Sequence, residues 1–267
     1  MIVLQLDGAD PGMTLMMTQG LAHVVIAGAA AALLVYLYQY GTYVLTAPES
    51  RRNLWYFAIA MGAAVIYGLV GIAALVTRLH WQELITEGAT LFFILFLALG
   101  FRALYLSAPV LAGRYADHEV GVDWFRQYFP PWLDYVIIGG YLLGWWGAFL
   151  FARPMTDIVV ALGWVIASLW AFVWGILIIQ RHEGTSLAAL TRHLFPAIVA
   201  FTITILADLY GTYFARTSTL VRATWIVGTV LVGAFLLTTA IALRQESGEV
   251  ERLYDWTTYR PPESDEE

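Results

Sequence analysis

Residues 219–243 read TLVRATWIVGTVLVGAFLLTTAIAL, and this stretch decides the fold. An α-helix rises 1.5 Å per residue and needs about 20 apolar residues to cross the roughly 30 Å of hydrocarbon in a bilayer. Residues 219–243 are long enough to do so, and six further apolar stretches precede them. The sequence therefore predicts an all-α protein, a bundle of seven transmembrane helices in the cell membrane.

Composition supports an integral membrane protein. Of the 267 residues, 60% are hydrophobic and 13% are charged, whereas soluble domains carry about 25% charged residues. Around a membrane domain at 18–243 we expect an extracellular tail at 1–17 and an acidic, disordered cytoplasmic tail at 244–267. Residues 111–130 are predicted to form an amphipathic segment on the cytoplasmic headgroups. The predicted transmembrane helices are residues 18–45, 52–79, 84–110, 132–151, 155–179, 194–214 and 219–243.

Two residue types are absent from the chain. It has no cysteine, which excludes disulfides and thiolate chemistry. Its 14 basic residues are all arginine, and the formal net charge is −6. An acidic, lysine-free composition fits a halophilic source or, equally, GC-rich coding bias. No basic run suggests nucleic-acid binding, and no phosphate-binding loop or catalytic motif suggests an enzyme.

The arginines are distributed unevenly along the chain. Cytoplasmic loops of membrane proteins carry an excess of positive charge. With the N-terminus outside and the C-terminus inside, the inner side collects ten of the 14 arginines and the outer side four, so we expect this orientation. The inner ones are Arg51, Arg52, Arg102, Arg114, Arg126, Arg181, Arg192, Arg244, Arg252 and Arg260, and the outer ones are Arg78, Arg153, Arg216 and Arg222.

Two local patterns are similar to the microbial (type 1) rhodopsins. Residues 49–56 read ESRRNLWY and precede a run of small residues that includes Gly62, Gly68 and Gly71. This combination resembles the second helix of the haloarchaeal opsins. Residues 232–235 read VGAF, which resembles the Val-Gly-Phe that follows the retinal lysine in that family. The resemblance implies a rhodopsin-like bundle of seven helices.

The chain lacks the residue that binds retinal in that family. Leu231 occupies the place of the retinal lysine, and Val227 occupies the place of the aspartate in the last helix. A Schiff base requires a primary amine, so we expect no covalent retinal. The resemblance implies an opsin-like membrane protein that acts as a sensor, a ligand-binding module or a partner-binding module.

Charged residues in the apolar stretches suggest an alternative, a proton or ion channel or a transporter. A charge inside a bilayer costs about 2.5–3.5 kcal/mol on insertion scales, so each one is a functional hypothesis. Asp208, Arg222 and Glu87 could form a pathway, or Asp208 and Arg222 could be a structural ion pair. Arg102 is expected to reach the cytoplasmic interface or to contact an anion there. Tyr210 belongs to an aromatic set that could line an apolar pocket or simply form the core, together with Tyr141, Trp145, Trp164, Trp170 and Trp174.

Histidines near the outer side offer a further, metal-binding hypothesis. His23, His80 and Glu87 could supply two imidazoles and a carboxylate to one ion. Alternatively, Glu87 and Asp134 are carboxylates in the first turns of helices, where the positive end of the helix dipole stabilises them.

Glycines in the fourth predicted helix indicate a close-packing face. Gly140 and Gly144 are four residues apart, and Gly147 follows them. Small residues at this spacing let two transmembrane helices approach closely. This face could pack within the bundle, or it could contact a second copy or another membrane protein. A larger membrane complex is therefore a third possible setting for the chain.

Overall fold

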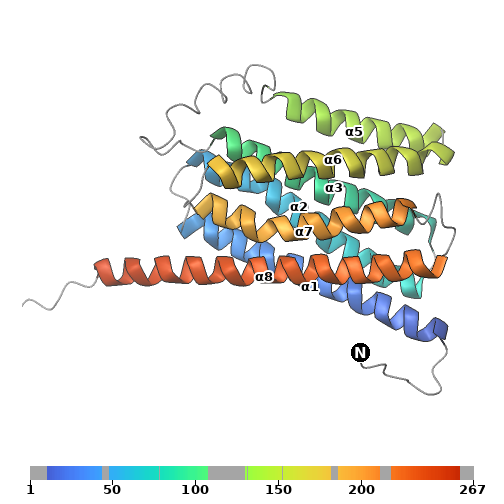
Figure 1. Cartoon of the computed structure of the whole chain (residues 1–267), viewed down its shortest axis with the longest axis horizontal. Helices are drawn as coiled ribbons and strands as arrows, with labels where there is room; N and C mark the ends of the chain where they lie inside the picture. Colours follow the sequence, from blue (N-terminus) through green and yellow to red (C-terminus); the bar gives the residue numbers. More distant parts are fainter. Residues whose placement is uncertain are drawn as a thin grey trace, which may run out of the picture.

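The computed structural model describes residues 11–43, 48–77, 79–107, 130, 132–151, 153–181, 186–210 and 218–258. This part of the chain contains seven α-helices, each long and apolar enough to cross a membrane (Figure 1). The predicted all-α fold, with seven helices long and apolar enough to span a membrane, is thus confirmed. The helices are α1 (Pro11–Tyr43), α2 (Pro48–Val76), α3 (His80–Ser107), α5 (Trp132–Phe151), α6 (Arg153–Arg181), α7 (Ser186–Tyr210) and α8 (Ser218–Thr258).

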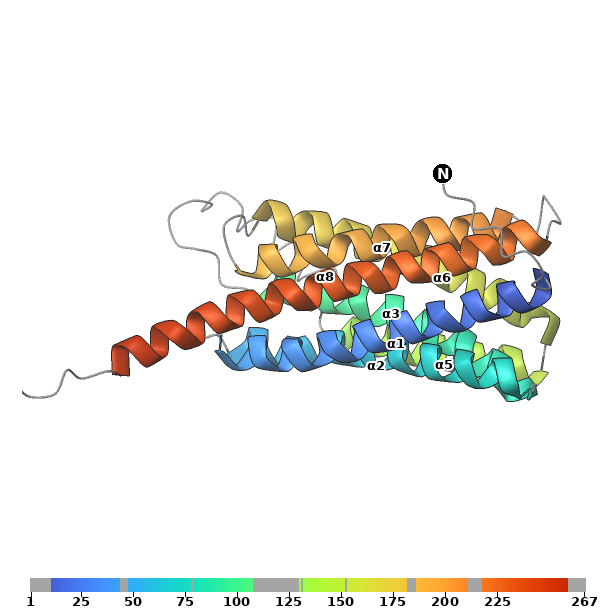
Figure 2. The same ribbon diagram turned by 90° about the horizontal axis from the view of Figure 1, so that it is seen from below.

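Six of these helices close into a ring. α1 packs against α2 and α8, α2 packs against α3, α3 packs against α6, and α7 lies between α6 and α8. α5 stands outside the ring, with α6 as its principal neighbour (Figures 1 and 2). Neighbours in the ring are therefore not all neighbours in the sequence, because α3 packs directly against α6.

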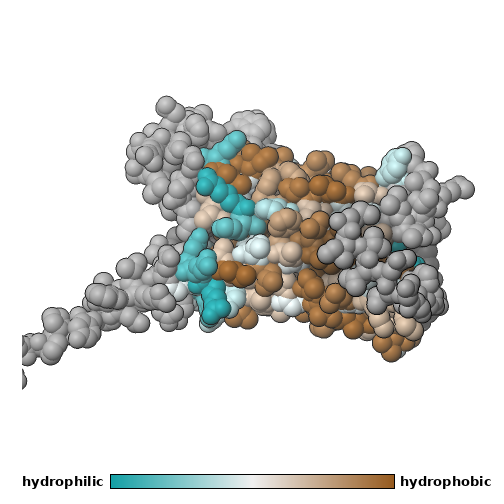
Figure 3. All heavy atoms as spheres, turned by 60° about the horizontal axis from the view of Figure 1, so that its bottom comes forward, coloured by the Kyte–Doolittle hydropathy of each residue, from teal (hydrophilic) through white to brown (hydrophobic). Residues whose placement is uncertain are grey.

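Burial differs most between α3 and α5. In the most apolar part of α3, 72% of the residues are buried, whereas in α5 only 17% are. On the face shown in Figure 3 the described helices are largely hydrophobic, and hydrophilic residues gather toward the end from which α8 projects. Such a surface suits a bilayer bounded by polar headgroups.

Three helices extend well beyond their predicted bounds at one end. The sequence predicts a disordered tail at residues 244–258, but α8 continues through them. These residues include Arg, Gln, Glu and Leu, which are strong helix formers. α1 begins at Pro11, inside the predicted tail, and proline is favoured in a first helical turn. α7 begins at Ser186 and exposes His193 while burying Leu194, so polar residues mask its start in a hydropathy reading. The predicted amphipathic segment lies outside the described residues, apart from Pro130.

Candidate functional site

A buried ion pair joins α3 to α5. Arg102 of α3 is fully buried, and its guanidinium forms a salt bridge with Asp134 in the first turn of α5. Arg102 Nη2 also donates a hydrogen bond to the carbonyl oxygen of Pro130, at 3.0 Å. Arg102 is therefore buried and paired inside the structure, whereas the sequence predicts that its guanidinium reaches an interface or an anion. Asp134 holds its predicted first-turn position, but its charge faces Arg102.

This pair fixes the beginning of α5. An uncompensated charge in an apolar interior costs several kcal/mol, so a buried arginine needs a carboxylate at the same depth. Arg102 lies near the end of α3, and Asp134 lies near the start of the next helix. Both therefore sit at the same end of the bundle. The sequence contains part of this signal, since opposite charges lie toward the end of one predicted helix and the start of the next predicted one.

The glycines of α5 face away from the bundle. A methyl group placed on Gly139, Gly140, Gly144 or Gly147 would meet no atom of the described residues within 4 Å. The predicted packing of these glycines within the bundle is therefore not found in the described structure. Of the two roles predicted for them, contact with another molecule is the one that this geometry permits.

α5 attaches to the ring through aromatic side chains instead. A methyl group on Gly163 of α6 would lie 2.6 Å from Tyr141 Cε1, and one on Gly88 of α3 would lie 2.7 Å from Trp145 Cη2. Glycines of the ring thus make room for the large side chains of α5. This arrangement leaves the glycine face of α5 on the outside.

Two of these glycines border an apolar groove. The groove lies between α3, α5 and α6 and has a volume of about 490 Å³. Gly140 and Gly144 line it on α5. Leu162 and Ile166 line it on α6, and the side chains of these two residues are more than half exposed. Its other lining residues are Leu95, Leu99, Val136, Ile137, Tyr141, Val159, Ala167 and Trp170. We call this surface, with Gly139 and Gly147, the α5 edge.

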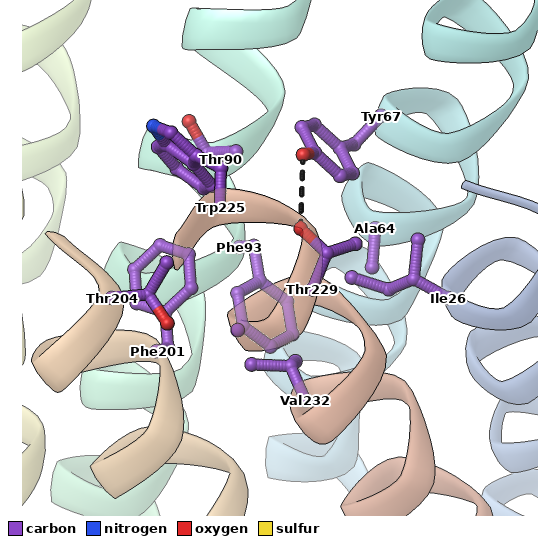
Figure 4. A pocket seen from close by; sticks show the side chains of 11 residues that line it. Ile26, Ala64, Tyr67, Thr90, Phe93, Phe201, Thr204, Trp225, Thr229 and Val232 are labelled. Carbon is purple, nitrogen blue, oxygen red and sulfur yellow. Dashed lines mark hydrogen bonds between the residues drawn. The ribbon is translucent and has the colours of Figure 1, made fainter. Parts of the chain in front are cut away.

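The centre of the ring contains a much smaller void (Figure 4). Its volume is about 20 Å³, and residues of α1, α2, α3, α7 and α8 surround it. The hydroxyls of Tyr67 and Thr229 lie 3.4 Å apart beside it, and Trp164 Nε1 donates a hydrogen bond to Thr90 Oγ1 at 3.2 Å. A site for a drug-sized ligand has about 300–1,000 Å³. The void therefore has no room for such a ligand.

The predicted aromatic set is divided between three places. Trp145, Trp164 and Trp174 are buried in the core, whereas Tyr141 and Trp170 line the groove at the α5 edge. Tyr210 is 63% exposed at the end of α7. These residues do not form a single pocket.

His23 is buried between α1 and α2. Its ring packs edge-on against Tyr67, with ring centroids 5.1 Å apart, and fills the space beside Gly71. Its Nδ1 has no hydrogen-bond partner among the described residues. No group of three His, Asp, Glu or Cys side chains lies together in the part of the chain that the structure describes. The side chain of His80 lies outside that part, so a site with His23, His80 and Glu87 stays a prediction.

The predicted pathway residues are divided between the two ends of the bundle. Arg222 and Tyr210 are exposed and Glu87 is half-buried, all three toward the end where α3 and α8 begin. Arg102 lies toward the opposite end. The side chain of Asp208 lies outside the described residues, so its pairing with Arg222 also stays a prediction.

The positions matched to retinal chemistry face outward. Leu231 and Val227 of α8 are 44% and 58% exposed, whereas Thr229 and Val232 line the central void. A side chain at either matched position therefore points away from the centre of the ring. The resemblance of residues 232–235 to the opsins therefore does not bring Leu231 or Val227 to the central void.

Comparison with known proteins adds no relative. No known protein family, no curated protein and no solved structure matches the chain. Function is therefore inferred from the α5 edge, the ion pair and the cavities themselves.

Proposed function

We propose that this protein is a non-enzymatic cell-membrane protein that binds a transmembrane helix of a partner at the α5 edge. The observation that carries the proposal is the outward orientation of Gly139, Gly140, Gly144 and Gly147 beside an open apolar groove. Helices in lipid associate by close van der Waals packing of small residues, because lipid chains are as apolar as the helices themselves. A second helix laid on this face would approach the backbone of α5 closely.

The α5 edge is held in place before a partner arrives. The salt bridge between Arg102 and Asp134 fixes one end of α5, and Tyr141 and Trp145 fix its inner face against α6 and α3. A surface that is already ordered loses less conformational freedom on binding. This supports recognition of a helix by a preformed surface.

Binding of a partner is better supported than the two alternatives. A sensor of an internal ligand needs a cavity, and the void in the ring measures about 20 Å³. A transporter needs polar groups that follow one another across the bundle, and Arg102 is already neutralised by Asp134.

The orientation and the likeness to opsins are part of this proposal. The arginine distribution favours an N-terminus on the outside, and with that orientation Arg102 and the extended end of α8 belong to the cytoplasmic side. The likeness to opsins rests on residues 49–56 and 232–235 and on the number of helices. It concerns the architecture, without covalent retinal.

The absence of cysteine allows a direct test. The variant Gly144→Cys, labelled with a thiol-reactive photo-crosslinker in native membranes, would carry a single reactive position. We expect illumination to join the 29.7 kDa chain to a second polypeptide as one discrete product. A product of twice the mass identifies a second copy, and any other discrete mass identifies a different membrane protein.

A matched control is Leu69→Cys, on the surface of α2, where Leu69 is 56% exposed. This position should give no discrete product. Three outcomes would contradict the proposal. Gly144→Cys could give no product, or both cysteine variants could give equal products. The double variant Gly144→Cys, Gly140→Leu could also give the same product as Gly144→Cys alone.

A further inference from the structure

A second groove lies where α1 ends and α2 begins. Its volume is about 380 Å³, and the last turns of α1 and the first turns of α2 form its wall, including Leu37, Leu54 and Ala58. Tyr38 and Trp55 also line it and are 78% and 71% exposed. It shares no lining residue with the α5 edge.

The length of this groove distinguishes between possible occupants. On α1 it runs from Leu34 to Thr42, which corresponds to about 12 Å at 1.5 Å per residue. A partner's transmembrane helix would need a contact surface across roughly 30 Å of hydrocarbon, whereas an acyl chain in one leaflet occupies about half of that. The groove therefore fits a lipid chain.

Two basic residues belong to the start of α2, at the end of the groove where this helix begins. Arg51 and Arg52 lie in the first five residues of α2. With about 100° between successive residues, Arg51 lies on the same side of α2 as Trp55 and Ala58, nearer the helix end. Glu49 lies roughly 200° around the helix from Arg51 and so on the other side.

Both features match the chemistry of one class of lipid. Basic residues at a membrane surface attract anionic headgroups, and exposed tyrosine and tryptophan favour the headgroup level. Arg102, by contrast, cannot take part, because it is buried and paired with Asp134. Of the two basic residues in α1 and α2, Arg51 is the one whose position on the helix is in line with the groove.

We infer that the groove between α1 and α2 binds an anionic phospholipid. The acyl chain lies along Leu37, Leu54 and Ala58, and the phosphate lies next to the first turn of α2, where Arg51 stands. This site is independent of the proposed partner site on α5, so either proposal can fail without the other.

The test uses the purified full chain in detergent, titrated with phosphatidylglycerol, with phosphatidylcholine or with inorganic phosphate. Native mass spectrometry counts bound lipid, and thermal unfolding reports stabilisation. We expect saturable binding and stabilisation by phosphatidylglycerol alone. Arg51→Gln should weaken this binding about fivefold, the effect of one basic residue at a membrane surface. Ala58→Trp, which fills the groove, should abolish it.

Two control variants separate specific from general effects. Arg222→Gln removes an exposed arginine at the other end of the bundle, and Leu69→Trp adds a tryptophan elsewhere on α2. Neither should change the binding of phosphatidylglycerol. Equal binding of the two lipids, the same stabilisation by inorganic phosphate, or equal weakening by Arg51→Gln and Arg222→Gln would each overturn the inference.

Discussion

The glycines of the ring and those of α5 perform opposite tasks. A methyl group on Gly228 of α8 would lie 2.7 Å from Thr204 Cβ, and one on Gly71 of α2 would lie 2.6 Å from His23 Cγ. The same group on Gly140 of α5 would meet no described atom within 4 Å. Ring glycines such as Gly228 and Gly71 thus determine how closely two helices pack, whereas those on α5 leave a surface open to another molecule.

The two regions also differ in how they are held together. The ring helices pack along their lengths, while α5 relies on two aromatic side chains and one buried ion pair. A region with few contacts depends strongly on each of them. Variants that remove these contacts, or that fill the glycine positions, therefore distinguish the two regions.

The largest effect is expected from breaking the ion pair. Asp134→Leu leaves the buried guanidinium of Arg102 without its carboxylate, which should lower the free energy of unfolding by about 3–5 kcal/mol. Unfolding in mixed micelles of a mild detergent and dodecyl sulfate would measure this loss. The double variant Arg102→Met, Asp134→Leu carries no buried charge and should recover most of the stability. If it is as unstable as the single variant, the charge pair is not what holds α5.

A filled glycine position in the ring should have the next largest effect. Gly228→Ala forces its new methyl group against Thr204, and overpacking of this kind costs about 1–3 kcal/mol. Gly140→Ala on α5 should be neutral or slightly stabilising, because alanine is the better helix former. The same unfolding assay compares the two variants. Adding Thr204→Ala should return part of the loss only in the Gly228→Ala background, and equal losses at Gly228 and Gly140 would contradict the comparison.

A smaller effect is expected from the hydrogen bond between α6 and α3. Thr90→Val removes the acceptor for Trp164 Nε1, and hydrogen bonds between membrane helices contribute about 1 kcal/mol. A double-mutant cycle with Trp164→Phe would isolate this term. The pair should show coupling of that size, whereas Thr90→Val combined with Gly140→Ala on α5 should be additive. Coupling with α5 as strong as that with Trp164 would show that the two regions are not separate.

The number and position of the helices could be predicted from the sequence, but their orientation about their own axes could not. Bilayer thickness sets the length of an apolar stretch, so all seven crossings were recognisable. The side of a helix that faces lipid is as apolar as the side that faces its neighbours, so periodicity gives little help. This is why the sequence leaves open whether Gly144 packs within the bundle or against a partner. For the same reason the resemblance aligns Leu231 with the retinal lysine, although Leu231 faces away from the centre of the ring.

Polar residues were misread where depth alone was considered. The sequence predicts that Arg102, near the helix end, reaches the interface, yet its side chain is fully buried beside Asp134 of α5. The end of α8 was misread for the opposite reason. The charge of residues 244–258 predicts a disordered tail, whereas their helix propensity continues α8 through them.

The smallest effect on stability, and the most informative one for function, is expected from Gly144→Leu. The leucine side chain extends into open space at the α5 edge, so the free energy of unfolding should change by less than about 0.5 kcal/mol. The same side chain would prevent a second helix from approaching the α5 backbone, so association with the partner found by crosslinking should be lost. Energy transfer in liposomes between the labelled chain and that labelled partner, a second copy or the other membrane protein, measures it. Gly62→Leu on α2 also extends into open space, away from α5, and should leave both stability and association unchanged. Loss of association without loss of stability would separate the two tasks of glycine in this molecule. If Gly144→Leu unfolds the protein, then α5 glycines serve the fold after all.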